Sequence, residues 1–415
     1  MKTAILTVGT EILFGQIVNT NAAFLSQQLN NLGYDVMYHY TVGDNPGRLA
    51  ELIHLAFRDC DLILTTGGLG PTQDDLTKET IAKAMGDVVV EKPACMKYLK
   101  ENYERAGRKM TPNNLKQAYM PSRATVLPND AGTAPGFALE QDGKIIIAMP
   151  GPPREMQRMF ELQVKPLLQK KQDSVIYYRM LRMFGIGESS LETVLLPLID
   201  GQTDPTLATY AKEGECSLRI ASKRATEEEA RAAVDEMTEK VRSLVGDYIY
   251  SYDDEDLIDV VGRLLLEKKI TIACAESCTG GLFAGALTDT SGISEVFGHG
   301  YVTYSCEAKE TELGVKPETI ETYGVVSPQV AEEMAGGLAA KTGAKLCISV
   351  TGLAGPDGGS AEKPVGLAYI GVSYEGRLYA VKSYYRNVSR KWNRHYTLLR
   401  MLFEVYRLIS PEKPA

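Results

Sequence analysis

Residues 270–281, which read ITIACAESCTGG, constrain the fold of this chain more than any other segment. The β-branched beginning predicts a strand, the glycine-closed end predicts a tight turn, and the apolar run 282–287 predicts a helix. This order is typical of an α/β domain. Such a turn leaves backbone N–H groups free at the start of the helix and exposes small hydroxyl side chains. The segment therefore indicates a site for a hydroxyl nucleophile as well as a fold class.

The first 170 residues also alternate between strands and helices. Strands are expected at 4–8, 61–65 and 144–148, with helices at 20–32 and 48–58. This order predicts a mostly parallel sheet with crossover helices. Ligand sites in such sheets lie at the carboxyl ends of the strands.

The pattern changes in the middle of the chain. Residues 171–252 predict a small α/β module, and the α/β alternation returns over 253–415, with strands at 270–275, 345–350 and 366–372. Three domains are thus expected, with boundaries at 1–170, 171–252 and 253–415. The acidic stretch 251–256 fits either a linker or the N-cap region of the next helix.

Composition narrows the class of protein. The net charge of −8 over 415 residues argues against a generic nucleic-acid surface, which favours a basic balance. No apolar run approaches the ~20 residues of a membrane span, and the apolar part of the N-terminus is too short for a signal peptide. Seven scattered cysteines indicate reduced, mostly buried thiols and a cytoplasmic protein.

A glycine-rich loop follows the strand at 61–65. Glycines there let the backbone approach a phosphate closely, and Thr72 adds a polar group. Asp74 and Asp75 supply hard oxygen ligands suited to Mg²⁺ or a similar divalent cation. The alternative is a glycine-rich turn in which Asp75 caps the helix expected at 77–85. The glycines concerned are Gly67, Gly68 and Gly70.

Polar residues after the other strands of this domain point to the same edge of the sheet. Glu11 and Asn21 follow the first strand, and Gly151 follows the strand at 144–148. Three loops at three strand ends predict one ligand cleft. Asn113 belongs to a helical stretch that fits either this cleft or a solvated face.

The last third of the chain carries candidates for acyl transfer. Ser277 is the favoured nucleophile, with Cys278 and then Thr279 as alternatives in the same turn. Lys309 is a candidate base because burial lowers the pKa of a lysine, and Tyr304 lies between Ser277 and Lys309 in the sequence. The backbone N–H groups of Gly280 and Gly281 are candidate donors to an oxyanion.

A second glycine loop follows the strand at 345–350 and could provide either an oxyanion hole or a phosphate site. Its candidate residues are Thr351, Gly352, Ala354 and Gly355. Arg390 and Arg394, four residues apart at the start of the last helix, could bind an anionic group.

The chain resembles the CinA family (competence/damage-inducible protein A) along nearly its full length. The motifs that carry the resemblance are GGLGPTQDD at 67–75, NDAGTAPG at 129–136, PGPPREM at 150–156, AESCTGG at 275–281, VTY at 302–304 with Lys309, and TGLAGP at 351–356 with KPVG at 363–366. The segment 385–394 departs from the family pattern, because it lacks a glycine before the last helix, and this leaves the roles of Arg390 and Arg394 open.

The resemblance implies an α/β protein of three domains. The first is a molybdopterin-binding-like, three-layer domain associated with metal-dependent hydrolysis of ADP-ribose to AMP and ribose 5-phosphate, in which Asp74 and Asp75 match the metal and pyrophosphate site. The second is a small KH-like domain. The third is an amidohydrolase domain that converts nicotinamide mononucleotide (NMN) to nicotinate mononucleotide and ammonia without a cofactor.

Further roles follow from the same resemblance. Ser277 matches the nucleophile, Lys309 its base and Tyr304 an assisting group, while Thr351 and the glycines after it match substrate-site residues and Arg394 a phosphate contact. The resemblance also implies a homodimer that recycles pyridine nucleotides, with Mg, Mn or Co as the divalent metal. Two other readings stay open: an N-terminal domain that binds a pterin or nucleotide without turnover, and an adaptor in DNA uptake or repair.

Overall fold

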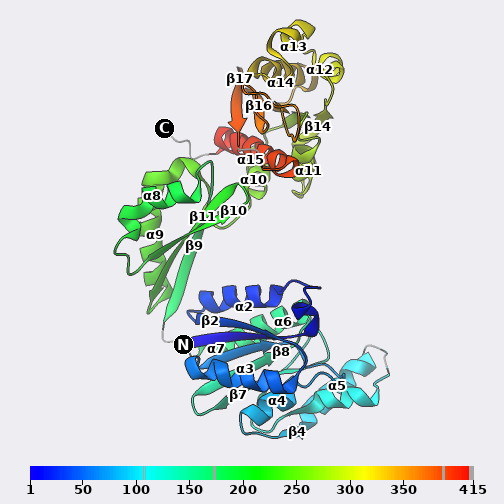
Figure 1. Cartoon of the computed structure of the whole chain (residues 1–415), viewed down its shortest axis with the longest axis vertical. Coiled ribbons are helices and arrows are strands. Elements are labelled where there is room, and N and C mark those ends of the chain that lie inside the picture. Colours follow the sequence, from blue (N-terminus) through cyan, green and yellow to red (C-terminus); the bar gives the residue numbers. More distant parts are fainter. Residues whose placement is uncertain (106, 108, 172–173, 386–387, 411–415) are drawn as a thin grey trace. The chain divides into compact units, whose positions relative to one another are not determined.

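The structure is a computed structural model that describes residues 1–105, 107, 109–171, 174–385 and 388–410. Its contacts divide the chain into two compact units (Figure 1). The first comprises residues 1–178 with 222–233, and the second comprises 179–221 with 234–415.

A six-stranded sheet of order β2-β1-β3-β8-β7-β6 forms the centre of the first unit. β2, β1, β3 and β8 run parallel to one another, whereas β7 pairs antiparallel with β8, and β6 antiparallel with β7. The prediction of a mostly parallel sheet is therefore confirmed. The strands are β1 (Lys2–Val8), β2 (Asp35–Val42), β3 (Leu62–Thr66), β8 (Lys144–Met149), β7 (Gly136–Gln141) and β6 (Thr125–Leu127).

Helices cover both faces of this sheet and make a three-layer domain. One apolar core joins the sheet to α3 (Pro46–Asp59), α4 (Thr77–Ala84) and α5 (Pro93–Arg105). The other joins it to α2 (Thr20–Asn31) and α6 (Pro153–Met159), followed by η2 (Phe160–Val164) and α7 (Lys165–Gln169). Because both faces are covered, β3 is buried at all five positions, which explains why its sequence, LILTT, has no charged residue.

A four-stranded sheet of order β10-β11-β9-β12 follows. It carries α8 (Glu188–Ile199) and α9 (Glu227–Val245), and the apolar positions on one side of α9 are buried. The strands are β9 (Val175–Phe184), β10 (Thr206–Lys212), β11 (Glu215–Arg224) and β12 (Ile249–Ser251).

The acidic stretch 251–256 is not a free linker. Asp256 is the N-cap of α10 (Leu257–Lys268), as the second of the two readings expected. Buried Arg182 pairs with Asp254 at 3.2 Å and with Asp256. The acidic side chains therefore compensate a buried guanidinium.

The C-terminal sheet has the order β14-β13-β15-β16-β17. β13 (Ile272–Glu276) runs parallel to β14 (Phe297–Val302) and β15 (Leu346–Gly352), while β16 (Leu367–Tyr374) and β17 (Arg377–Tyr384) pair antiparallel. One face packs against α10, α11 (Leu282–Thr288) and α15 (Arg390–Ile409). The other packs against α12 (Cys306–Leu313) and α14 (Pro328–Thr342), so this domain also has three layers.

The α/β fold class is confirmed in the three larger sheets, beside which β4 (Val89–Glu91) and β5 (Tyr119–Pro121) form a sheet of two strands. Two details differ from expectation. Residues 112–118 form a 3₁₀ helix, η1 (Pro112–Ala118), and edge strands such as β2 and β14 have no clear sequence signal because much of their surface is exposed. All seven cysteines are free thiols, and six are buried. Among the described residues, no helix is long and apolar enough to cross a membrane.

Candidate functional site

Ser277 and Lys309 meet at the carboxyl end of β13. Ser277 is the first residue after the strand, and its side chain is held in the turn before α11 with 8% exposure. Lys309 extends from α12, is fully buried, and places Nζ 3.0 Å from Ser277 Oγ. This geometry allows direct proton transfer between the two groups.

The surroundings of Lys309 favour its neutral form. Burial is the main cause that lowers the pKa of the ammonium. Nζ also donates to the carbonyl of Thr303 at 2.7 Å, and no carboxylate pairs with it among the described residues. A lysine in these surroundings can act as a general base nearer to neutral pH than an exposed one.

The two alternative nucleophiles differ from Ser277 in their surroundings. Burial is the main cause that raises the pKa of the Cys278 thiol to about 12, which keeps it protonated. Thr279 is fully buried, and its Oγ1 has no hydrogen-bond partner among the described residues. Of the three side chains, Ser277 is the one for which the structure shows a hydrogen bond to a candidate base.

Glu276, a residue that was not predicted as functional, organises the turn. Its buried carboxylate accepts hydrogen bonds from the backbone N–H groups of Gly281, Phe283 and Ala284 at 3.0, 3.1 and 2.9 Å. It thereby occupies the anion-binding end of α11.

This corrects the prediction that Gly280 and Gly281 donate to an oxyanion. The Gly281 N–H is bound to Glu276, and the Gly280 N–H donates to the carbonyl of Ser277 at 3.0 Å. Within the described residues, the N–H groups of Cys278 and Thr279 have no acceptor, so these two donors of the turn are available.

Arg394 and Arg390 hold the site from α15. Arg394 donates through Nε to the carbonyl of Cys278 at 3.0 Å and through Nη2 to that of Thr279 at 2.6 Å. Arg390 is exposed and donates to Gly355 O at 2.7 Å and to the hydroxyl of Tyr304 at 2.8 Å. Both arginines are therefore at the site, but Arg394 uses its guanidinium to fix the nucleophile turn, and Arg390 lies at the solvent side.

The loop after β15 closes the site from another side. Thr351 is buried and donates its hydroxyl to Val325 O at 2.8 Å, so that hydroxyl is engaged. Gly352 lies so close to the turn that a Cβ there would be 3.0 Å from Cys278 Sγ. The carbonyl of Ala354 accepts from Asn393 at 3.0 Å, which ties the loop to α15 together with the Arg390–Gly355 contact.

The glycine-rich loop of the first unit is tightly built. Gly67 has φ +106° and its Cβ would lie 2.0 Å from the carbonyl of Val8, so no other residue fits there. At Gly68 a Cβ would collide with the Thr77 hydroxyl, and at Gly70 with the Asp75 carboxylate. These glycines allow the loop to pack on β1 and on its own acidic end.

Asp74 and Asp75 have different settings. Asp75 accepts from the Thr72 backbone N–H at 2.9 Å and from the Thr72 hydroxyl. The alternative reading is wrong in its cap, because the N-cap of α4 is Leu76 and no side chain caps that helix. Asp74 is exposed, and hydrogen bonding from Thr72 is the main cause that holds its pKa below the usual value. Both carboxyls therefore belong to the loop, but only that of Asp74 is exposed.

Asp74 and Asp75 are the carboxylates of this loop that could take part in holding a cation. No group of three His, Cys, Asp or Glu side chains suited to a metal occurs among the described residues. Two adjacent carboxylates without a third protein ligand suit Mg²⁺ or a similar ion, which retains water and binds substrate phosphates.

Asn21 and Gly151 come together as expected, whereas Glu11 and Asn113 do not join them by any contact. Asn21 Nδ2 donates to Gly151 O at 2.7 Å and to Thr66 Oγ1 at 3.0 Å, and its buried Oδ1 has no partner among the described residues. Glu11 is exposed and folds over Gly9, and Asn113 accepts from Thr111 within η1.

Two lysines near the loop were not predicted as site residues. Lys116 of η1 donates to the carbonyls of Thr72, at 3.1 Å, and Asp75. Lys78 is fully buried, donates to Lys116 O at 2.7 Å, and burial lowers its pKa to about 8. Of the two readings left open for the helical stretch that contains Asn113, the solvated face does not hold at Lys116, because η1 brings this lysine to the loop.

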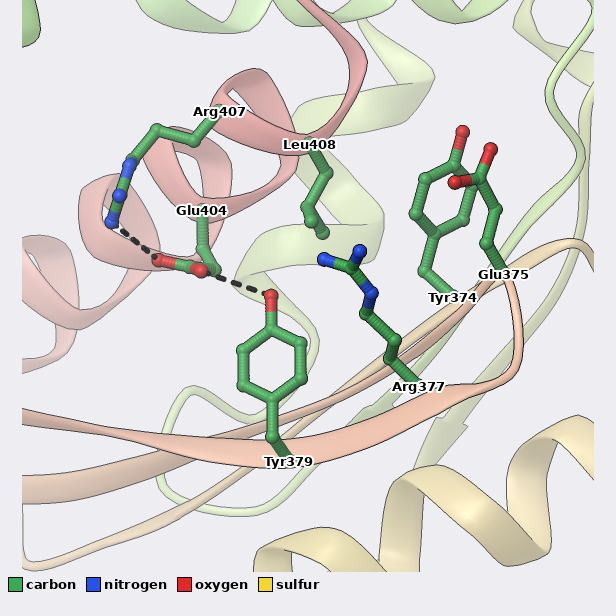
Figure 2. A pocket seen from close by; sticks show the side chains of 7 residues that line it. All are labelled: Tyr374, Glu375, Arg377, Tyr379, Glu404, Arg407 and Leu408. Atoms are coloured by element: carbon green, nitrogen blue, oxygen red, sulfur yellow. Dashed lines mark hydrogen bonds and ion pairs between the residues drawn. The ribbon is translucent and has the colours of Figure 1, made fainter. Parts of the chain in front are cut away.

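A separate polar pocket of about 280 Å³ lies near the other end of α15 (Figure 2). Buried Glu404 accepts from the hydroxyl of Tyr379 at 3.2 Å and pairs with Arg407 at 3.8 Å, while Arg377 extends into the pocket from β17. None of the predicted site residues lines it.

Three family models match the chain one after another. They are described as "Probable molybdopterin binding domain" over residues 4–170, "Damage-inducible protein CinA KH domain" over 178–251, and "CinA C-terminal domain" over 254–409.

Whole relatives match as well. A competence-damage inducible protein of Clostridium kluyveri is 49% identical over 379 residues, which cover 91% of this chain and 92% of the relative. Its namesake in Clostridium botulinum (Kyoto, type A2) is 47% identical over 97% of this chain and 98% of its own length. A solved CinA structure of unknown function from Thermoplasma acidophilum is 36% identical over 40% of this chain and 97% of that chain, with a TM-score of 0.38.

Proposed function

The chain belongs to the CinA family, and on this premise we propose that its C-terminal domain hydrolyses the amide of NMN to give nicotinate mononucleotide and ammonia. The observation that carries the proposal is the 3.0 Å contact between Ser277 Oγ and the Nζ of a fully buried lysine that has no carboxylate partner among the described residues. NMN is proposed as the substrate because the motifs of this domain resemble those of NMN amidohydrolases.

The first half of the reaction forms an acyl-enzyme. Ser277 Oγ attacks the amide carbon while its proton passes to neutral Lys309 Nζ. The C–N bond then breaks, and Lys309 returns the proton to the leaving nitrogen, so that ammonia departs and the nicotinoyl group is esterified to Ser277. The N–H groups of Cys278 and Thr279 are suited to stabilise the oxyanion, because Gly280 and Gly281 are engaged elsewhere.

The second half regenerates the serine. Water attacks the ester carbon and gives its proton to Lys309, the bond to Oγ breaks, and Lys309 returns a proton to Ser277. Arg390, exposed beside Tyr304, is the favoured contact for the substrate phosphate, while Arg394 holds the turn.

The test is ammonia release from NMN by the purified chain, with and without EDTA, beside Ser277→Ala. We expect activity that resists EDTA and disappears in the variant. A folded wild-type protein without activity would contradict the proposal, and so would a Ser277→Ala variant that retains it.

We infer a second activity, hydrolysis of ADP-ribose to AMP and ribose 5-phosphate, in the molybdopterin-binding-like domain. The observation that favours it is the pair Asp74 and Asp75 at the rim of a loop that packs on β1. A divalent cation bound there would polarise a phosphoryl oxygen and activate water. Thr72 and Lys116 hold the loop that presents the two carboxylates. Asn21, which is bonded to Thr66 and Gly151, has a buried Oδ1 without a partner among the described residues.

Two other functions can be separated from this one by experiment. If the domain binds a pterin or nucleotide without turnover, ADP-ribose hydrolysis by the wild type will equal that of Asp75→Asn. If the chain is an adaptor in DNA uptake or repair, it will bind DNA at low salt, where phosphate contacts are strongest.

A further inference from the structure

The polar pocket near the last turns of α15 is separate from the Ser277 site. It has a volume of about 280 Å³, and its walls come from the β16–β17 hairpin and from α15 (Figure 2). Arg394, which holds the nucleophile turn, and Arg407, which lines the pocket, lie about 20 Å apart along the axis of this helix. Neither proposed activity therefore uses the pocket.

The buried carboxylate of the pocket is already compensated. Glu404 accepts from the hydroxyl of Tyr379 at 3.2 Å and pairs with Arg400 at 3.3 Å and with Arg407 at 3.8 Å. Burial is the main cause that raises the pKa of Tyr379 to about 12, so the hydroxyl keeps the proton that it donates. Because a guanidinium has five N–H donors, Arg407, whose side chain is 47% exposed, retains donors for a ligand.

Arg377 brings a further guanidinium into the pocket. It is the exposed first residue of β17, and Figure 2 shows it extending into the pocket without a bond to another lining residue. Within the described part of the chain it has no hydrogen bond or ion pair. The nearby carboxylate of Glu375 lies instead beside the hydroxyl of Tyr374, whose pKa is raised by burial and then by this carboxylate. The charge of Arg377 is thus free to bind an anion.

The hairpin turn that carries Glu375 has a costly backbone. Tyr374 pairs with Arg377, so the turn consists of Glu375 and Gly376, with φ of +50° and +76°. Asn-Gly is the usual sequence of such a turn, because other side chains rarely adopt positive φ. The glutamate held there places an exposed carboxylate at the rim of the pocket. Strained residues of this kind cluster at sites that bind ligands.

The charges in and beside the pocket favour an anion that also carries hydroxyl groups. Three guanidinia face two carboxylates, which leaves one positive charge in excess. The guanidinia are those of Arg377, Arg400 and Arg407, and the carboxylates are those of Glu375 and Glu404. A phosphate monoester carries about 1.5–2 negative charges and has oxygens that match the fork of a guanidinium. The volume lies just below that of pockets for drug-sized molecules, so the ligand is small.

We propose that this pocket binds a small sugar phosphate. Arg377 and Arg407 donate to the phosphate oxygens, and the carboxylate of Glu375 accepts from a sugar hydroxyl. No bond is made or broken, so the pocket is a binding site and not a further catalytic centre. It depends on neither proposed activity.

The first test is calorimetric titration of the full chain with ribose 5-phosphate. It is done with EDTA and in an Arg390→Met background, which remove the divalent metal and the candidate phosphate contact near Ser277. We expect Arg377→Met to weaken binding by about 10-fold or more, the effect of a lost charge-assisted hydrogen bond. Lys382→Met is the matched control, because it removes one positive charge from an exposed position of β17 outside the pocket. Absence of binding, or equal affinities of the two variants, would overturn the proposal.

Two further titrations test the class of ligand. Inorganic phosphate should bind about 3- to 10-fold more weakly than ribose 5-phosphate, because it lacks the hydroxyl groups that reach Glu375. Ribose, which lacks the phosphate, should give no measurable binding. Binding of ribose as tight as that of ribose 5-phosphate would exclude a phosphate site, and equal affinities for the two phosphates would exclude a role of the sugar.

The last test locates the ligand. Phenylglyoxal modifies accessible arginines, and mass spectrometry of the peptides measures the rate at each position. Ribose 5-phosphate at ten times its Kd should slow the modification of Arg377 by about 10-fold, since the free fraction of the site falls by that factor. Arg263, exposed on α10 outside the pocket, should react at an unchanged rate. Modification of Arg377 that the ligand does not slow would overturn the proposal.

Discussion

At the residue scale, the turn after β13 presents three adjacent side chains with a potentially nucleophilic atom, all less than 10% exposed. Their surroundings differ. The Ser277 hydroxyl is hydrogen-bonded to Lys309, while burial keeps the Cys278 thiol protonated. We expect Ser277→Ala to lower ammonia release from NMN by about 10³-fold or more, and Cys278→Ala to retain most of it, because only the first removes the attacking oxygen. The opposite ranking of the two variants would make Cys278 the nucleophile.

The pH dependence should report Lys309. Its pKa is lowered from 10.5, mainly by burial, and the neutral form is the base. kcat/KM should therefore rise with pH up to a folded-state pKa that is lower than 10.5, and level off above it. Lys309→Arg should be inactive at every pH, since a guanidinium stays protonated. A pH profile measured on the wild type that is flat through the neutral and alkaline range would exclude Lys309 as the base.

Substitutions of the two arginines of α15 should change different kinetic constants. Arg390→Met should raise KM for NMN by about 10- to 100-fold, the size of a lost charge-assisted hydrogen bond, and have little effect on the riboside that lacks the phosphate. Arg394→Met should lower kcat on both substrates, because the carbonyls of Cys278 and Thr279 lose their donor. Equal effects of Arg390→Met on nucleotide and riboside would show that it does not contact the phosphate.

At the element scale, the buried central strands were predictable and the edges were not. β3 and β13 are buried along their whole length, so their sequences are mostly apolar or β-branched, and Glu276 at the end of β13 is the charged exception. β14 contains two glycines and is mostly exposed, and its pairing depends on β13 beside it. The turn after β13 was predicted as a site, but the role of Glu276 was not, because a glutamate at a strand end looks like a surface charge until the helix beyond it is placed.

The carboxylate of Glu276 should therefore be essential to α11. Glu276→Ala leaves three N–H groups without their acceptor, and we expect a loss of about 2–4 kcal/mol in the free energy of unfolding, measured by denaturant titration. Glu276→Gln should lose less, because its amide oxygen still accepts. Glu318→Ala, at an exposed first-turn position of α13 (Pro317–Tyr323), is the control and should change stability by less than about 0.5 kcal/mol. If the free energy of unfolding fell as little as in the control, water would be accepting from the three N–H groups in place of Glu276.

At the scale of the whole molecule, the chain carries two chemically different candidate sites in two compact units. One pairs a serine with a buried lysine, and the other presents two carboxylates near a glycine-rich loop. The motifs and their order predicted the two loops that carry these side chains, and the chemistry of each loop stays a prediction. The contacts of Lys116 with the acidic loop and with Lys78 were not predictable, since they join residues about 40 positions apart.

Because each site uses only residues of its own unit, removal of the metal should separate the two activities. EDTA should abolish ADP-ribose hydrolysis and leave ammonia release from NMN unchanged, since a serine and a lysine require no cation for acyl transfer. Asp74→Asn should likewise abolish ADP-ribose hydrolysis, because Asp74 is exposed at the rim of the loop. Ser277→Ala should leave ADP-ribose hydrolysis intact. Each variant is thereby the folding control of the other when both reactions are followed on the same preparation. Loss of both activities in Asp74→Asn, with an unchanged unfolding transition, would contradict independent sites and show that the two units are coupled in function.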